Sequence, residues 1–280
     1  MIEIGKTQVL RINREVDFGV YLIKEGDEVL LPKKYVPEEF ELGDEIEVFV
    51  YKDHQNRPVA VTLIPAGEVG DIVGAKVTHT TDFGAFVDIG LEKDVLVPMK
   101  EQSKDMVTGR SYAVKLLLDH MTERMIGTTK IGAFLSNNDI DFQVGDEVEV
   151  IIWHKTDLGF KVIIDQEHVG LIYENEVFEN LYAGQSKKGY IKQIREDNKL
   201  DITLQQQGYQ AVIDSTDQIL LAIKENGGTL PVGDKSSPEE IKERFNMSKK
   251  NFKKILGGLY KAGEIEINDY QISIKGGRSA

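Results

Sequence analysis

The stretch "TDFGAFVD" (Thr81–Asp88) decides the fold, because a similar stretch occurs at two other places in the chain. It appears upstream as "VDFGVYLI" (Val16–Ile23) and downstream, with changes, as "TDLGFKVI" (Thr156–Ile163). Aligning the copies superposes segments of about 65 to 75 residues, each with alternating, strand-like sequence before and after the shared stretch. The repeat therefore predicts three copies of one strand-rich module.

The Asp-Phe-Gly tripeptide inside this stretch is also the magnesium-binding signature of protein kinases. A kinase needs in addition a glycine-rich loop, a strand lysine and a His-Arg-Asp catalytic loop upstream of the tripeptide. The sequence contains none of these three features. The tripeptide is therefore interpreted as part of the repeated module and not as a kinase site.

The composition indicates a soluble globular protein of several domains, with 280 residues, 41% hydrophobic and 29% charged. No apolar run approaches the roughly 20 residues that cross a bilayer, and the N-terminus lacks the sections of a signal peptide. These features predict a cytoplasmic protein. The absence of cysteine excludes disulfides, thiolate catalysis and cysteine-based zinc sites.

The charge is unevenly distributed along the chain, whose net charge is −13. Residues 1–208 hold 23 Lys+Arg against 37 Asp+Glu, whereas residues 209–280 hold 11 against 10. If the acidic part binds a polyanion, it must do so through local basic patches and ring stacking, with weak long-range attraction.

Each module is expected to form a five-stranded Greek-key barrel, because short alternating strands surround a second strand that glycine interrupts. The strand before each shared stretch predicts inward-facing pairs at Leu10 and Ile12, Ala75 and Val77, and Val150 and Ile152. The last strand of the third module, "KLDITL" (Lys199–Leu204), predicts a half-buried sheet with Asp201 and Thr203 on the polar face. Turn-forming joints divide the chain into barrels at 1–66, 67–138 and 139–208 and a further domain at 209–280.

The module resembles the RNA-binding domain named after ribosomal protein S1, through Asp-Phe-Gly-Ala-Phe-Val, a following Leu-Val strand and a late Asp-to-Arg stretch. The second module matches this pattern best and the third least. The resemblance implies an OB-fold barrel that binds RNA. The histidine that the family carries on its third strand is replaced by Pro32 and Pro98 in the first two modules and by Tyr173 in the third.

The physical basis of such a site is a pair of exposed rings. Phe83 and Phe86 are three apart in a strand, so they share a face only if Gly84 bends the chain between them. Two rings on one face form a platform on which unstacked bases lie, at roughly 1–3 kcal/mol per base. In the family pattern a nearby cation holds the phosphates, which here would be Arg124, with Asp119 as its companion.

The other modules supply equivalent candidates. In the first module they are Phe18, Tyr21 and Arg57, with Asp53. In the third module, Leu158 and Lys161 stand where the rings should be, and Phe160, Tyr173 and Lys199 are the candidate replacements. Trp153 is expected to point outward and to add stacking surface. The alternative interpretation is that these rings cover a neighbouring domain and that the arginines are ordinary solvated cations.

From Tyr209 onward the apolar period changes from two to about 3.6, which predicts helices. Helices are expected to begin after the capping residues Ser215, Ser237 and Ser248, the first ending at Gly227-Gly228. The third carries a core-facing stripe consisting of Phe252, Ile255, Leu256, Leu259 and Tyr260. A two-stranded ribbon turning near Asn268-Asp269 follows, so the domain resembles a winged helix.

The opposite side of the third helix carries Lys249, Lys250, Lys253 and Lys254, with no acidic residue from Ser248 to Gly263. Lysine is a point charge, so this patch would neutralise phosphates without reading sequence. Gly257 and Gly258 on the same side would allow another surface to approach closely. The alternative is a solvated lysine face on a domain that binds protein.

Chemistry of other kinds has little support in the sequence. The five histidines show no metal-ligand spacing, so neither a metal nor another cofactor is expected. His79 and His154 fall at equivalent places in two modules, which is interpreted as shared strand structure. S1-type ribonucleases add a separate catalytic domain, and no residues remain here to form one, so the protein is not expected to be an enzyme, a membrane protein or a binder of a small-molecule substrate.

Three S1-type barrels followed by a winged helix resemble the CvfB-like family of bacterial regulators. This resemblance implies an RNA-binding protein that affects gene expression after transcription. Two alternatives stay open at this point. One is a DNA-binding transcriptional regulator whose winged helix dominates and whose barrels serve assembly, and the other is a nuclease with metal-dependent RNA cleavage.

Overall fold

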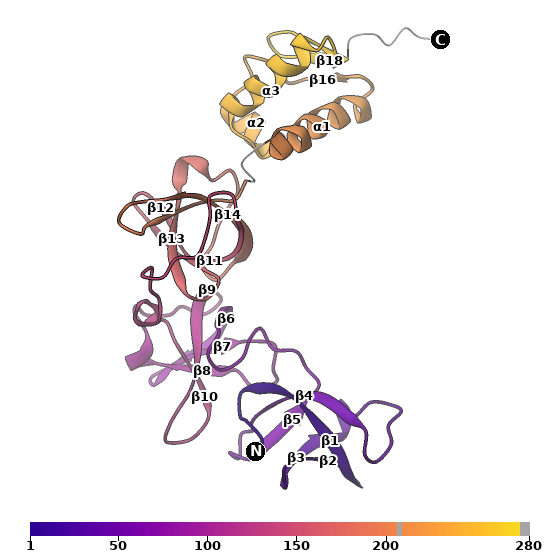
Figure 1. The fold of residues 1–280 in the computed structure, drawn as a ribbon, viewed down its shortest axis with the longest axis vertical. Coiled ribbons are helices and arrows are strands. Elements are labelled where there is room, and N and C mark those ends of the chain that lie inside the picture. Colours follow the sequence, from indigo (N-terminus) through magenta and orange to yellow (C-terminus); the bar gives the residue numbers. More distant parts are fainter. Residues whose placement is uncertain (206–208, 275–280) are drawn as a thin grey trace.

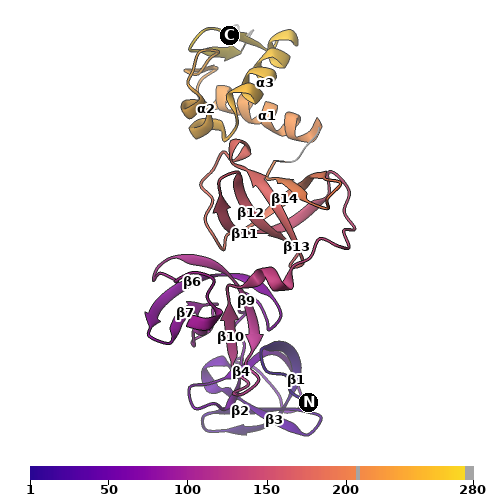
Figure 2. The same cartoon turned by 90° about the vertical axis from the view of Figure 1, so that its left-hand side faces the viewer.

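The computed structural model describes residues 1–205 and 209–274, which form four units that follow one another along the longest axis of the molecule (Figure 1, Figure 2). The first three units are closed barrels of five strands, and the fourth contains three helices and a three-stranded sheet. In the described part of the chain, no helix has the length and apolar character needed to cross a membrane.

The three barrels have the same topology. In each one the strands are joined in the order first, second, third, fifth and fourth, and the third and fifth strands pair in parallel. The strands are β1 (Lys6–Val16), β2 (Gly19–Lys24), β3 (Asp27–Pro32), β4 (Glu45–Lys52) and β5 (Pro58–Val61) in the first barrel. They are β6 (Ile72–Thr81), β7 (Gly84–Asp88), β8 (Val95–Pro98), β9 (Ser111–Leu118) and β10 (Met125–Thr128) in the second, and β11 (Glu147–Thr156), β12 (Gly159–Ile164), β13 (His168–Tyr173), β14 (Ser186–Ile194) and β15 (Leu200–Thr203) in the third. The predicted OB-fold barrels are confirmed.

The inward-facing positions predicted for the first strands are all buried. Their exposed fractions are 2% or less, and the residues are Leu10, Ile12, Ala75, Val77, Val150 and Ile152. The prediction of a half-buried last strand in the third barrel is wrong, because every residue of β15 is buried, including Asp201 and Thr203. The polar face of β15 is covered by other parts of the barrel, and Asp201 is paired there with Arg195.

Short 3-10 helices follow the third strand of each barrel, η1 (Lys33–Tyr35), η2 (Met99–Glu101) and η4 (Glu174–Glu176), and η3 (Ile131–Phe134) follows β10. In each barrel the pairing of the first strand with the second shifts by one residue, as in a β-bulge. The shift comes directly after the second of the inward-facing residues predicted for the first strand. The irregularity lies between Ile12 and Arg14 in β1, between Val77 and His79 in β6, and at the same place in β11. An extra residue of this kind re-aims the side chains that follow it.

The glycine of the shared stretch is needed for close approach of a neighbouring strand, and not for the bend that the sequence analysis predicts. Gly84 is the first residue of β7, and a Cβ atom on it would lie 2.4 Å from the carbonyl oxygen of Val97 in β8. The corresponding Cβ positions at Gly19 and Gly159 would lie 2.2 Å and 2.1 Å from carbonyl oxygens of β3 and β13. Glycine is required because the third strand approaches the backbone at this point.

The first and second barrels share an apolar core. Phe49 and Tyr51 of β4 are 1% and 8% exposed and belong to the same buried cluster as Val73, Val87 and Leu116 of the second barrel. Polar bonds surround this cluster, among them one of 2.8 Å from Lys52 Nζ to Glu123 Oε2. These contacts fix the two barrels relative to each other.

The second and third barrels meet through a smaller apolar cluster that contains Ile72, Ile131, Ile151 and Ile163. Trp153 points out of its own barrel, as predicted, and is half-buried because it packs against this cluster. The neighbouring barrel therefore covers part of the surface that the sequence predicts for stacking. The backbones also touch at this junction, because a Cβ atom on Gly74 would lie 1.6 Å from the carbonyl oxygen of Gly184.

The fourth unit contains α1 (Tyr209–Glu225), β16 (Thr229–Leu230), α2 (Pro238–Phe245), α3 (Lys249–Lys261), β17 (Ile265–Ile267) and β18 (Ile272–Ile274). Ser237 and Ser248 cap α2 and α3 as predicted, each accepting a backbone hydrogen bond three residues on. Strand β16 joins the predicted ribbon and makes a three-stranded sheet.

Two local predictions for this unit are wrong. Helix α1 begins at Tyr209, so Ser215 lies inside the helix and is not its N-cap. The core-facing stripe of α3 ends at Leu259, and Tyr260 is 58% exposed because the sheet covers only one side of the last helical turn. The winged-helix arrangement itself is confirmed.

The contact between Gly74 and Gly184 generates a prediction about domain arrangement. Replacing Gly74 with alanine puts a methyl group into backbone of the third barrel, which should cost about 1–3 kcal/mol and push the two barrels apart. Small-angle X-ray scattering should show an increased radius of gyration, while circular dichroism should show intact barrels.

The matched control is Gly132→Ala at the same junction, where the new Cβ would meet its nearest atom, in Trp153, at an ordinary 3.5 Å. Its scattering should equal that of the unmodified chain. Identical scattering and melting for Gly74→Ala would show that the two backbones do not touch at this junction.

Candidate nucleic-acid interface

The second barrel presents the ring pair that the sequence predicts. Phe83, in the turn before β7, is 60% exposed, and Phe86 in β7 is half-buried. Their ring centroids lie 5.9 Å apart with an interplanar angle of 85°. Because one ring is open and the other stands beside it edge to face, the pair offers aromatic surface to a base.

His79 adds a third ring that the sequence analysis assigned to shared strand structure. The change of register in β6 places His79 opposite Phe86, and the two rings stack with centroids 4.4 Å apart and planes at 8°. His79 Nδ1 lies 3.0 Å from Thr78 Oγ1, which donates to Asp94 Oδ2 at 2.6 Å. The stacked imidazole covers one face of Phe86 and holds its ring in place.

Arg124 and Asp119 lie in the hairpin between β9 and β10, where their backbones are hydrogen-bonded but their side chains do not pair with each other. Asp119 Oδ2 accepts hydrogen bonds from the backbone and hydroxyl of Thr122, and the hydroxyl bond holds the pKa of this carboxyl below its usual value. Arg124 Nε donates 2.9 Å to Asn56 Oδ1 of the first barrel. Arg124 therefore stands at the junction of two barrels with no carboxylate against it among the described residues.

The first barrel repeats this arrangement with a different partner for the inner ring. Phe18 is 57% exposed and Tyr21 is half-buried. Arg14 occupies the place of His79, with its Cζ 3.7 Å from the centroid of the Tyr21 ring and an ion pair of 2.9 Å to Glu28. The predicted cation Arg57 is bound to Asp53 Oδ2 at 2.7 Å and 3.0 Å, yet its side chain stays 68% exposed.

The ring pairs of both barrels border hollows of about 500 Å³. The hollow of the second barrel is about 510 Å³ and is lined by Phe83, Phe86 and Arg124 among others. That of the first barrel is about 450 Å³ and is lined by Phe18 and Arg57 among others. Each hollow thus combines aromatic and cationic groups, which is the combination that single-stranded nucleic acid requires.

The third barrel lacks such a ring pair. Phe160 is only 9% exposed and packs in the barrel core, so the prediction that it replaces a stacking ring is wrong. Its side chain takes the inward position in β12. Leu158 and Lys161 occupy the two exposed ring positions.

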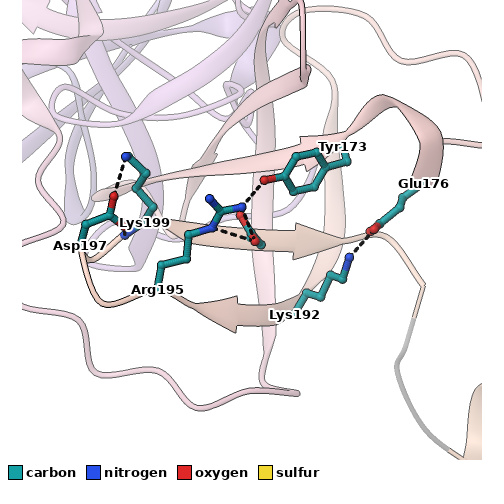
Figure 3. A network of polar contacts seen from close by, with 7 residues as sticks. Tyr173, Glu176, Lys192, Arg195, Asp197 and Lys199 are labelled. Atoms are coloured by element: carbon teal, nitrogen blue, oxygen red, sulfur yellow. Dashed lines mark hydrogen bonds and ion pairs between the residues drawn. The ribbon is translucent and has the colours of Figure 1, made fainter.

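Tyr173 and Lys199 of the third barrel are found in a polar network (Figure 3). Arg195 donates to Asp201 Oδ2 at 2.9 Å and 3.0 Å and to the hydroxyl of Tyr173. Lys199 lies at the end of the same hairpin and pairs with Asp197 at 2.5 Å, away from Tyr173. The structure therefore brings Tyr173 to Arg195 and not to Lys199.

Arg195 is the functional candidate that the sequence analysis missed, together with Arg14. The backbone N–H of Arg195 donates to the carbonyl of Lys199 across the hairpin. The same backbone bond joins Asp53 to Arg57 in the first barrel and Asp119 to Arg124 in the second. Arg195 therefore stands at the hairpin position that aspartate fills in the other barrels. Alignment of the three hairpins shows this reversal of charge and would have identified Arg195 from the sequence.

Helix α3, whose place in the fourth unit Figure 1 shows, has three of the predicted lysines exposed, away from its buried stripe: Lys250, Lys253 and Lys254. Lys250 and Lys254 are exposed and have no ion-pair partner in the described part of the chain, whereas Lys253 pairs with Asp234 at 2.9 Å. Lys249 is half-buried at the start of the helix. A Cβ atom on Gly257 or Gly258 would meet nothing within 4 Å, so this side of α3 is open.

Comparison with known families matches three parts of the chain. Residues 4–63 match the S1 domain, residues 67–132 match the S1 RNA binding domain, and residues 217–274 match the CvfB-like winged helix domain. These families are nucleic-acid-binding domains and not catalytic ones. Among the residues that the structure describes, no group of His, Asp or Glu side chains is arranged to hold a metal ion.

Relatives match over nearly the whole chain. The protein YitL of Bacillus subtilis (strain 168) is 31% identical over 271 residues, which cover 93% of this chain and 90% of that protein. Conserved virulence factor B of Staphylococcus epidermidis is 29% identical, with 91% and 90% covered. A solved structure, titled as a multidomain protein with nucleic acid binding domains from Streptococcus pneumoniae, is 25% identical with a TM-score of 0.46, and the match covers 97% of this chain and 98% of that one. The full-length identity and the matched C-terminal domain together show that the chain belongs to the CvfB-like family.

Proposed function

We propose that this protein is an RNA-binding regulator that acts on gene expression after transcription, in the cytoplasm and without catalytic activity. Single-stranded RNA lies on the aromatic and basic faces of the barrels, and the winged helix adds phosphate contacts. The observation that carries the proposal is the pair of the exposed ring of Phe83 and the half-buried ring of Phe86 in the hollow that Arg124 also lines, which recurs in the first barrel as Phe18 and Tyr21.

Unpaired RNA fits these faces better than a duplex does. A ring can stack only on a base whose face is free, and proteins find such bases in single-stranded loops and ends. The cations around the rings are single side chains from different strands and loops, and they do not form the continuous basic stripe that tracks a duplex backbone. The name of the staphylococcal relatives, conserved virulence factor B, supports virulence genes as part of the regulated set.

The third barrel and the winged helix are proposed to contribute differently. The third barrel offers Tyr173 with Arg195 in place of an open ring pair, so its contribution should rest on charge more than on stacking. In the winged helix, Lys250 and Lys254 form an exposed pair one helical turn apart on α3. Point charges of this kind bind phosphates of any sequence.

The ring pair gives the first test of this function. The double variant Phe83→Ala/Phe86→Ala should weaken binding of single-stranded RNA by about 2–6 kcal/mol, because each stacked base contributes roughly 1–3 kcal/mol. Fluorescence anisotropy measures this change with a labelled oligonucleotide of about 15 nucleotides, near the upper end of the site size of one such barrel.

The control variant is Phe134→Ala, which removes a 45% exposed ring of the same barrel that lies outside the hollow. Its RNA affinity should stay within twofold of the original. Unchanged affinity for the double variant, with a normal circular dichroism spectrum, would contradict the proposed function.

The lysines of α3 give the second test. The variant Lys250→Gln/Lys254→Gln should lower the slope of log affinity against log salt concentration by about 1.4 for single-stranded RNA, since each phosphate contact contributes about 0.7. Titrations at two or more salt concentrations measure the slope.

Lys235→Gln serves as the matched control, because Lys235 belongs to the same domain but is paired with Asp269 at 2.8 Å. It should leave the slope unchanged. If the double variant instead loses duplex DNA binding and keeps its RNA affinity and slope, the winged helix reads DNA, and the transcriptional regulator becomes the better description.

A further inference from the structure

The hollows of the first and second barrels are two parts of one groove. Tyr51, His54 and Lys93 line both of them, so the hollows adjoin at the junction of the barrels. One end of the combined groove carries Phe18, and the other carries Phe83. We name this feature the junction groove.

We propose that the junction groove binds one continuous strand, with the bases on the ring pairs of both barrels and a phosphate between them held by Lys93 and Arg124. This inference rests on the proposed function for the kind of ligand, and it adds the path of the strand. It also predicts that the first two barrels act as a single binding unit.

Lys93 and Arg124 are suited to a phosphate because they are neighbouring cations without a carboxylate partner in the described part of the chain. Lys93 Nζ donates to the backbone oxygens of Lys52 and Asp53 at 3.1 Å and 3.0 Å, which fixes its position but leaves its charge unneutralised. Arg124 Nε donates to Asn56, so the other N–H groups of its guanidinium are the ones that can donate to a phosphate. Burial and the nearby Arg124 lower the pKa of Lys93, so the two cations repel each other and an anion between them would relieve this repulsion.

None of the acidic residues that line the groove forms an ion pair with Lys93 or Arg124, and each has another hydrogen-bond partner. Asp53 is held by Arg57, Asp94 accepts from Thr78, and Asp119 accepts from Thr122. Glu92 pairs with Lys34 across the same junction, and Glu28 pairs with Arg14. At the crossing point Lys93 and Arg124 therefore stand without a carboxylate in ion-pair contact, and Asp53 acts on Lys93 only through longer-range attraction.

The rigidity of the junction makes one strand more favourable than two. The barrels share an apolar core, so both ring pairs are presented in a fixed relation and the second contact of a strand is intramolecular. Two separate short strands would each lose their own translational freedom on binding. A strand long enough to reach both ring pairs should therefore bind much more tightly than a short one.

The test uses the full chain with single-stranded RNA of about 5 and about 15 nucleotides, lengths near the lower and upper ends of the roughly 4–16 nucleotides that one barrel covers. The long strand should form a complex of one RNA with one protein chain. Its affinity should fall at least tenfold in either double variant, Phe18→Ala/Tyr21→Ala or Phe83→Ala/Phe86→Ala. For the short strand, either double variant should change the affinity of the tightest site by no more than about twofold, since the other barrel still binds.

The crossing point is tested separately with Lys93→Gln and Arg124→Gln. Each should weaken binding of the long strand about fivefold and lower the salt slope of that binding. Lys76→Gln, an exposed lysine of β6 outside the groove, is the control for the loss of one positive charge. Thermal melting checks that each variant is folded, and Arg124→Gln decides the matter if Lys93→Gln is destabilised.

The outcomes separate the two proposals. If the unmodified chain binds neither RNA, the proposed function fails. If it binds two long strands at once, or binds long and short strands with equal affinity, the proposed function stands and the continuous strand is overturned.

Discussion

The packing of β4 against the second barrel is the interaction on which the rest of the arrangement depends. Phe49 and Tyr51 are buried in a cluster that belongs mostly to the neighbouring barrel. Burying two aromatic side chains in this way stabilises the contact by several kcal/mol, far more than the exposed ion pairs around it. Because that contact is apolar and well packed, the ring-bearing faces on either side of it keep a fixed orientation.

The acidity of the barrels is compatible with binding a polyanion because most groove carboxylates serve the backbone and neighbouring side chains. Asp53 and Asp119 both organise the hairpin between the fourth and fifth strands of their barrels, through bonds to Arg57 and Thr122. Glu123 likewise has a structural partner, because it pairs across the junction with Lys52, whose side chain is only 10% exposed. Such a surface attracts nucleic acid weakly from a distance and holds it through close contacts.

The sequence predicted the barrels, the winged helix and the exposed positions of Phe18 and Phe83, because alternation and repetition depend only on local spacing. It could not predict what depends on neighbouring domains. Trp153 alternates outward in its strand, but the second barrel covers part of it. Phe160 carries a ring near the right place in the repeat, but it faces inward.

The groups around the rings also escaped prediction, for a different reason. The change of register in β1 and β6 places Arg14 and His79 on the inner rings, and a one-residue irregularity leaves no mark in an alternating pattern. Arg195 could have been found by comparing hairpins, whereas the bond from Arg124 to Asn56 links residues 68 positions apart and requires the folded junction.

The backbone contact between Gly74 and Gly184 has a consequence for how this architecture can change over evolutionary time. The two barrels meet there main chain against main chain, which is possible only because glycine at position 74 has no side chain. Substitutions of surface side chains elsewhere on either barrel leave this contact in place, so they can alter which ligands are recognised without changing the spacing between the two modules.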